Sequence, residues 1–114
     1  MTIPSPMKLQ WFHILLALRD RALHGYGIQR AVLERTDGQL RLWPATLYRL
    51  IGALEEEGYI GPADGPVDEP DDQRRQYYAL TPSGKDRLRK EAAMLADWAR
   101  AAGIAGERWE GGVR

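Results

Sequence analysis

Apolar residues recur every three or four positions along much of the chain, which is the spacing of helices that pack one face on a core. The clearest stretch follows Trp43, and its apolar residues at this spacing are Leu47, Leu50, Ile51 and Leu54. Pro44 suits the first helical position, because its missing N–H would be unpaired there anyway. Gly58 suits the left-handed residue that closes a helix. The pattern therefore predicts a helix that starts at Pro44 and is capped by Gly58.

The opposite face of this helix lacks the long charged side chains that a solvated face usually carries. It has Ala45 and Gly52, with Thr46 and Tyr48 at its borders and Arg49 as its only cation. Short side chains let a helix approach another surface closely, and the major groove of DNA, about 12 Å wide, admits a helix. Taken alone, the stretch fits an ordinary amphipathic surface helix and a DNA-reading helix equally well.

Two other helical stretches precede this helix. The stretch from Met7 to Arg21 is apolar on more than half of a helix circumference, so it must be covered on two sides, by the last helix or by a second subunit. Ser5 and Pro6 suit its N-cap and first helical position. A second helix follows the segment HGYG and ends near residue 37. After it, Leu40 to Leu42 alternate as in a very short strand.

Extended segments and a final helix follow. Tyr59 and Ile60 begin one extended run, and Gln76–Leu80, beyond an acid- and proline-rich loop, has the aromatic residues typical of a strand. Thr81 and Pro82 suit the cap and first position of another helix. Helices followed by a β-hairpin are the order of a winged helix-turn-helix. The sequence therefore predicts a mainly α fold with a small β-hairpin, with a DNA-binding domain over residues 1–80 and a C-terminal dimerisation helix and flexible tail over residues 81–114.

The final helix, from Ser83 to about Ala102, has two apolar stripes. One has the four-three spacing of a coiled-coil seam and contains Leu88, Ala92, Leu95, Ala99 and Ala102. Met94 and Trp98 form the other. We expect the seam, together with Trp11 of the first helix, to hold a homodimer; packing within a monomer is the alternative. Trp98, Met94 and Trp11 are also the candidate walls of an apolar effector pocket at that interface, and a plain core role for Trp98 is the other interpretation.

Composition narrows the classes of function. Formal net charge is zero, but residues 55–72 contain acids and no cation, so a basic body carries an acidic segment. The chain has no cysteine and only two histidines, which excludes a thiolate metal site, and we expect no cofactor. No nucleophile, base and orienting partner can be assembled, so we expect no enzyme. No apolar run approaches the roughly 20 residues of a membrane span and no signal peptide is evident, so we expect a cytoplasmic protein.

Three segments, in the same order and spacing, resemble the PadR family of bacterial transcriptional regulators. LHGYGI resembles that family's LHGYEI, ATLYRLIGALEEEGYI resembles its GTLYPALKRLEKEGLI, and RRQYYALTPSG resembles its RRKYYRLTPEG. The resemblance implies a winged-helix homodimer that binds double-stranded operator DNA, usually as a repressor and in many members released by a small-molecule effector. The short final helix is similar to the smaller branch of the family, in which one C-terminal helix dimerises.

The resemblance also implies which residues contact DNA. Thr46 and Tyr48 lie in the match to the family's TLY, and Arg74 and Arg75 match its basic pair at the base of the wing. The full predicted DNA-binding set is Thr46, Tyr48, Arg49, Ala45, Gly52, Arg74 and Arg75. Ala45 replaces the usual glycine and Gly52 a common lysine. The wing tip from Asp68 to Asp72 is acidic, which opposes contact with phosphates. A winged-helix module used only for protein contacts is therefore the alternative function.

Overall fold

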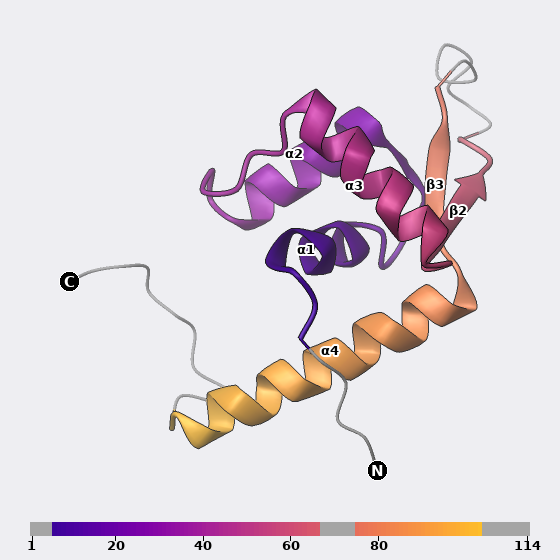
Figure 1. The fold of residues 1–114 in the computed structure, drawn as a ribbon. Helices are drawn as coiled ribbons and strands as arrows, with labels where there is room; N and C mark the ends of the chain where they lie inside the picture. Colours follow the sequence, from indigo (N-terminus) through magenta and orange to yellow (C-terminus); the bar gives the residue numbers. More distant parts are fainter. Residues whose placement is uncertain (1–5, 67–74, 104–114) are drawn as a thin grey trace.

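The computed structural model describes residues 6–66 and 75–103. Its elements, in order, are α1 (Leu9–Ala17), β1 (Leu23–His24), α2 (Gly25–Arg35), α3 (Pro44–Glu56), β2 (Ile60–Ala63), β3 (Tyr77–Leu80) and α4 (Pro82–Ala101). Helices α1, α2 and α3 gather together, β2 and β3 stand at the end of α3, and α4 runs below them (Figure 1). The predicted mainly helical fold with a small sheet is confirmed.

The strands form one antiparallel sheet in the order β1-β3-β2. The predicted hairpin is its β2–β3 half, with Ile60 opposite Leu80 and Ala63 opposite Tyr77. β1 adds a further strand, in which His24 also lies opposite Tyr77. Sequence reasoning missed β1, because a strand of 2 residues shows no alternation to recognise.

The short strand predicted at Leu40 to Leu42 is wrong, since this segment belongs to no strand or helix. Leu42 is fully buried in the core. Its carbonyl oxygen accepts a hydrogen bond of 2.6 Å from Nε2 of Gln29 on α2. A side chain thus satisfies a backbone group that a neighbouring strand would otherwise have to pair.

The helix α1 is shorter than predicted and is covered by its own chain. It begins after Lys8, its N-cap; Pro6 precedes the helix, and Ser5 lies outside the described residues. Ile14 and Leu15 are fully buried, because α1 packs against α2, α3 and α4. The cover on two sides that its apolar surface demands therefore comes from within the chain.

The core is formed by the helices and the sheet together. Its buried apolar side chains are Ile14, Leu15, Leu18, Ile28, Val32, Leu42, Leu47, Leu50, Ile51, Leu54, Ile60, Tyr78 and Leu88. Every apolar residue that was predicted to face the core from α3 belongs to this set. Burying one large aliphatic side chain contributes about 1.5–3 kcal/mol. Helix α3 is therefore firmly attached by one face, and its other face is presented outward.

The beginning of α4 is fixed against the end of α3. Thr81 caps α4, because its Oγ1 accepts a hydrogen bond of 3.0 Å from the Gly84 N–H. The Thr81 hydroxyl also donates to the carbonyl oxygen of Gly58 at 2.5 Å, and Gly58 has the left-handed φ of 79° that the sequence predicted. A Cβ on Gly84 would lie 1.9 Å from the carbonyl oxygen of Tyr59. Only glycine allows this close approach, which sets the direction of α4.

Farther along, α4 packs on the body and then leaves it. The buried carboxylate of Glu91 accepts hydrogen bonds from Arg87 at 2.8 Å and from the backbone N–H of Met7 at 3.0 Å. These contacts tie α4 to the segment that precedes α1. Beyond them, Leu95 is 37% exposed and Trp98 is 53% exposed, and the yellow end of α4 projects away from the other helices (Figure 1). The last turns of α4 thus carry apolar side chains that residues 6–66 and 75–103 leave exposed.

Candidate nucleic-acid interface

The outward face of α3 has the composition that the sequence predicted. Ala45, Tyr48 and Arg49 are exposed and Thr46 is half-buried. A Cβ added to Gly52 would meet no atom within 4 Å, so open space lies over this glycine. Within residues 6–66 and 75–103, no ion pair is formed by Arg49. The face therefore combines small side chains with the exposed cation of Arg49, which suits close contact with a groove.

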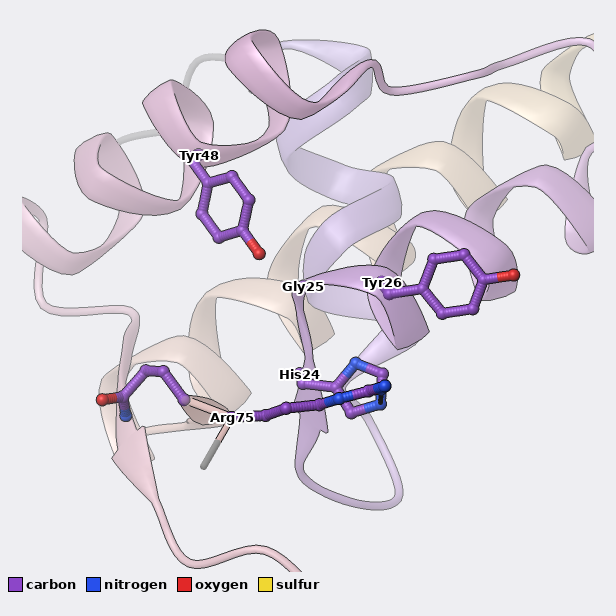
Figure 2. A pocket seen from close by; sticks show the side chains of 6 residues that line it. His24, Gly25, Tyr26, Tyr48 and Arg75 are labelled. Carbon is purple, nitrogen blue, oxygen red and sulfur yellow. Dashed lines mark hydrogen bonds between the residues drawn. The ribbon is translucent and has the colours of Figure 1, made fainter. Parts of the chain in front are cut away.

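A hollow of about 220 Å³ adjoins this face. It lies between the start of α2, the first half of α3 and the beginning of β3 (Figure 2). Its lining residues are His24, Gly25, Tyr26, Tyr48, Arg75 and Gln76. A Cβ on Gly25 would lie 2.3 Å from Oη of Tyr48, so the glycine leaves room for that hydroxyl against α2. Two residues predicted to contact DNA, Tyr48 from α3 and Arg75 from the segment before β3, thus meet in one hollow.

His24 is the residue that joins the parts of this hollow. Its Nδ1 accepts a hydrogen bond of 3.0 Å from the Gly27 N–H, which caps α2. Its Nε2 lies 2.8 Å from Nη1 of Arg75. The ring also stacks beside Tyr26, with centroids 6.3 Å apart, and meets Tyr77 edge-on at 5.2 Å. The imidazole therefore has a fixed orientation at the start of α2.

The tautomer of His24 determines what the hollow can bind. Because Nδ1 accepts from Gly27, a neutral imidazole carries its hydrogen on Nε2. A guanidinium carries only donors, so in this tautomer the contact of 2.8 Å between Nε2 of His24 and Nη1 of Arg75 brings two donors together and is not a hydrogen bond between them. An anionic oxygen accepts from such donors, as a phosphate group of a nucleic acid does.

Sequence reasoning missed His24, Gly25 and Tyr26 as site residues. The motif that contains them was interpreted only as a turn before a helix. Its role depends on β1, which places His24 opposite Tyr77 and so beside Arg75, a residue 51 positions away. No local pattern connects the two positions.

Arg74, which was predicted to contact DNA, and the acids from Asp68 to Asp72 lie outside the described residues.

Beside His24, a second hollow of about 430 Å³ is bordered by Arg30 and Glu34 of α2, which form an ion pair at 3.1 Å. Hydrogen bonds with Tyr26 and Glu34 raise the pKa of Arg30, so this side chain stays charged. Burial, followed by the proximity of Glu55 and Tyr48, raises the pKa of Tyr78, so its phenol stays protonated at neutral pH.

The residues predicted for the dimer interface and the effector pocket do not all lie on one surface. Leu88 needs correction, because it is 7% exposed and belongs to the core of its own chain. Met94 needs the same correction, because at 8% exposure it offers little surface to a ligand. The other predicted residues keep accessible surface: Ala92, Leu95, Trp98 and Ala102 are exposed, and Trp11 and Ala99 are half-buried.

Among residues 6–66 and 75–103, no group of histidine, cysteine or acidic side chains is arranged to hold a metal ion. None of the described helices has both the length and the apolar character to cross a membrane.

A family model and two curated sequences match most of this chain. The model of the family described as "Transcriptional regulator PadR-like family" matches residues 14–90. The chain is similar to an uncharacterized protein X of Lysinibacillus sphaericus, with 30% identity over 86 residues that cover 75% of this chain and 74% of that protein. It is also similar to an uncharacterized 37.1 kDa protein in transposon TN4556 of Streptomyces fradiae, with 35% identity over 83 residues, or 73% of this chain. That match spans only 22% of the larger protein.

Solved structures share the fold. A putative transcriptional regulator from Thermoplasma acidophilum is 29% identical with a TM-score of 0.62, and the match covers 82% of this chain and 85% of that one. A transcriptional regulator from Clostridium thermocellum has a TM-score of 0.66 at 24% identity, covering 82% of this chain and 86% of that one. A PadR-like transcription factor from Bacteroides fragilis has a TM-score of 0.64 at 19% identity, covering 82% and 85%. The arrangement of helices and strands described above is thus one that transcriptional regulators use.

Proposed function

We propose that this chain, which belongs to the PadR-like family of transcriptional regulators, acts by binding operator DNA sequence-specifically as a homodimer and represses transcription from it. The observation that carries the proposal is the junction of the outward face of α3 with the hollow of His24, Tyr48 and Arg75. One part has the shape of a groove-reading helix, and the other has the chemistry of a phosphate contact.

The parts of this surface would have different tasks on DNA. Arg49 extends from the middle of α3, from where a bidentate contact to guanine in the major groove is reachable. Ala45 and Gly52 would let the helix backbone approach, with Thr46 at the edge of the contact. Tyr48, His24 and Arg75 would bind phosphates and fix the position of α3, and Arg74 is proposed to assist them. Base contacts specify the sequence, whereas phosphate contacts position the protein.

The homodimer is proposed to form through the end of α4, with residues 1–80 as the DNA-binding part and residues 81–114 as the part that dimerises. Leu95 and Trp98 are the exposed apolar side chains there, and Ala92, Ala99 and Ala102 are small enough to allow close approach of a second helix. Two-fold symmetry would then place two copies of α3 in half-sites about 34 Å apart. An operator of this kind is a pseudo-palindrome.

Release by a small molecule is a further part of the proposal. BpsR of Bordetella bronchiseptica shares the fold, with 22% identity and a TM-score of 0.63 over 91% of this chain and 66% of that one, and its DNA binding is regulated by 6-hydroxynicotinic acid. In this chain Trp98, beside the proposed dimer contact, is exposed, and Trp11 on α1 is half-buried. Flat apolar compounds suit aromatic walls.

The experiment that tests the proposal begins with selection of duplexes from a random-sequence pool, followed by affinity measurements on the enriched duplex and a scrambled one over a range of salt. Arg49→Ala should cost about 1–3 kcal/mol on the enriched duplex and little on the scrambled one. Arg75→Ala should weaken both and lower the salt slope by about one. Arg89→Ala on α4, whose side chain is 72% exposed, is the matched control that should change neither.

Failure to enrich any duplex would contradict the proposal and favour a module for protein contacts. Equal loss on both duplexes for Arg49→Ala would leave DNA binding intact but exclude base readout by this residue.

A further inference from the structure

The segment before α3 presents an aromatic side chain and a cation to solvent on a rigid support. Leu42 is fully buried and its carbonyl oxygen is held by Gln29. Its neighbours Arg41 and Trp43 are both exposed, with Trp43 at 63%. The guanidinium carbon of Arg41 lies 5.0 Å from the centre of the Trp43 ring, which is within the range of a cation–π contact. The cation and the ring therefore lie together on either side of a buried residue.

This position is an unusual one for tryptophan. Trp43 is the N-cap of α3, and the helix starts without any side-chain hydrogen bond at its cap. Serine, threonine, aspartate and asparagine are the residues that normally fill this position, because their oxygens accept from the first backbone N–H groups. The chain thus has an exposed ring at a position where a capping side chain is favoured, and that ring is accessible to a partner.

The surroundings of the pair indicate the charge of that partner. The first turn of α3 contains no acid. Arg41 forms no ion pair within residues 6–66 and 75–103. A flat ring beside an unneutralised cation matches a strand of nucleic acid, in which apolar deoxyribose surfaces alternate with phosphates.

We infer that Arg41 and Trp43 form an outer DNA contact at the N-terminal end of α3, Arg41 with a phosphate and the Trp43 ring with the adjoining deoxyribose. The inference rests on the proposed function, since it assumes that α3 faces a duplex. The 13 residues of α3 span about 20 Å, so this contact lies at the other end of the helix from β2 and β3 (Figure 1). It would add a contact with the DNA backbone at that end of the helix.

Three variants distinguish the contribution of the Trp43 ring to DNA binding from the effects of the helix cap and of the Arg41 charge. Trp43→Ser removes the ring but supplies a good N-cap, so loss of folding is not expected. Trp43→Phe keeps a ring. Binding to the duplex enriched by the unmodified protein is measured over a range of salt. Trp43→Ser should weaken binding about tenfold with an unchanged salt slope, because the lost contact is uncharged. Trp43→Phe should retain most of the affinity, and Arg41→Ala should lower the slope by about one.

A second readout locates the ring itself. Quenching of tryptophan emission by acrylamide, a neutral quencher, is compared between the unmodified protein and Trp43→Phe, with and without the duplex. The difference between the two proteins reports Trp43, and DNA should protect that fraction. If the unmodified protein binds the duplex but Trp43→Ser and Arg41→Ala keep its affinity and slope, the inference is overturned and the proposed function stands. If no duplex is enriched at all, both the inference and the proposed function are contradicted.

Discussion

Trp43, the N-cap of α3, and Trp98 on α4 are both exposed, at 63% and 53%, yet their surroundings differ. Trp43 lies at the start of α3 with the guanidinium of Arg41 over its ring. Trp98 lies near the end of α4, one turn beyond the exposed Leu95 and next to Ala99. An exposed tryptophan is therefore informative through its neighbours. A cation beside the ring favours an anionic polymer, whereas an aliphatic row favours a second apolar surface.

The region of α3 near Trp43 and the region of α4 near Trp98 are separate surfaces on helices that both pack against α1. Helix α1 packs against α2 and α3 on one side and against α4 on the other, and Glu91 ties α4 to the segment before α1. Substitutions on the solvent side of either region should therefore leave the fold of the other intact. If the comparison is right, DNA contact can be impaired without loss of association.

The largest effect is expected from Leu95→Glu, which places a charge in the proposed contact of two copies of α4. Two-fold symmetry doubles the loss, and each buried leucine contributes about 1.5–3 kcal/mol. The dimer should dissociate, as measured by light scattering after gel filtration. Ala93→Glu is the matched control, because Ala93 is exposed on the opposite side of the same helix and should leave the mass unchanged. An unchanged dimer for Leu95→Glu would remove α4 from the interface.

A smaller effect, confined to the other region, is expected from Gly25→Ala. The new methyl group would lie 2.3 Å from Oη of Tyr48, so the tyrosine has to leave the hollow and its proposed phosphate contact is lost. One such hydrogen bond to a charged group corresponds to roughly tenfold in affinity. Gly27→Ala is the matched control, because its methyl group would meet no atom closer than 3.4 Å. Equal DNA affinity for the two variants would argue against a role for the hollow, and the dimer mass should not change in either.

The smallest effect concerns His13 on α1, the helix that both regions share. Its Nδ1 is buried without a hydrogen-bond partner among the described residues. Burial, and secondarily the charge of Arg35, lower the pKa of His13 below its ordinary value of 6.5. The unfolded chain therefore binds the proton more readily than the folded one. The contribution of the neutral His13 imidazole to stability is complete above about pH 6.5. It is lost as the pH falls below that value toward the pKa of His13 in the folded chain.

This loss cannot exceed about 1.4 kcal/mol per pH unit, the limit for one proton. Urea unfolding of the unmodified protein and of His13→Leu, at about pH 7.5 and about pH 5.5, measures it. The variant should lose less stability between the two conditions. An identical loss in both proteins would assign the pH dependence to other groups.

The sequence was sufficient for the parts of the fold that depend on local periodicity and capping. Four apolar residues at helical spacing and the end residues Pro44 and Gly58 predicted α3 correctly, and Thr81 and Pro82 predicted the start of α4. The strand β1 and the place of Leu42 could not be predicted in the same way. Both depend on partners far along the chain, β3 for the one and Gln29 for the other.

The candidate site was predictable only in part for the same reason. The outward residues of α3 follow from the helical repeat, so Tyr48 and Arg49 were identified from the sequence. The contact of His24 with Arg75 follows from strand pairing and has no local signature. On α4, the spacing alone could not separate Leu88, which its own chain buries, from Leu95, which it leaves exposed. The difference in burial between these two leucines depends on which turns of α4 pack against the rest of the chain.

The most direct test of the account is a titration of the isotopically labelled protein with its enriched duplex, followed through the indole N–H signals of the tryptophans in two-dimensional NMR. The chain has 4 tryptophans, and a Trp43→Phe and a Trp98→Phe variant assign the two that matter. The account predicts that the Trp43 signal shifts on DNA binding while the Trp98 signal keeps its position in the dimer. A shift of Trp98 with an unchanged Trp43 would contradict it, because DNA would then lie on α4 and not on α3.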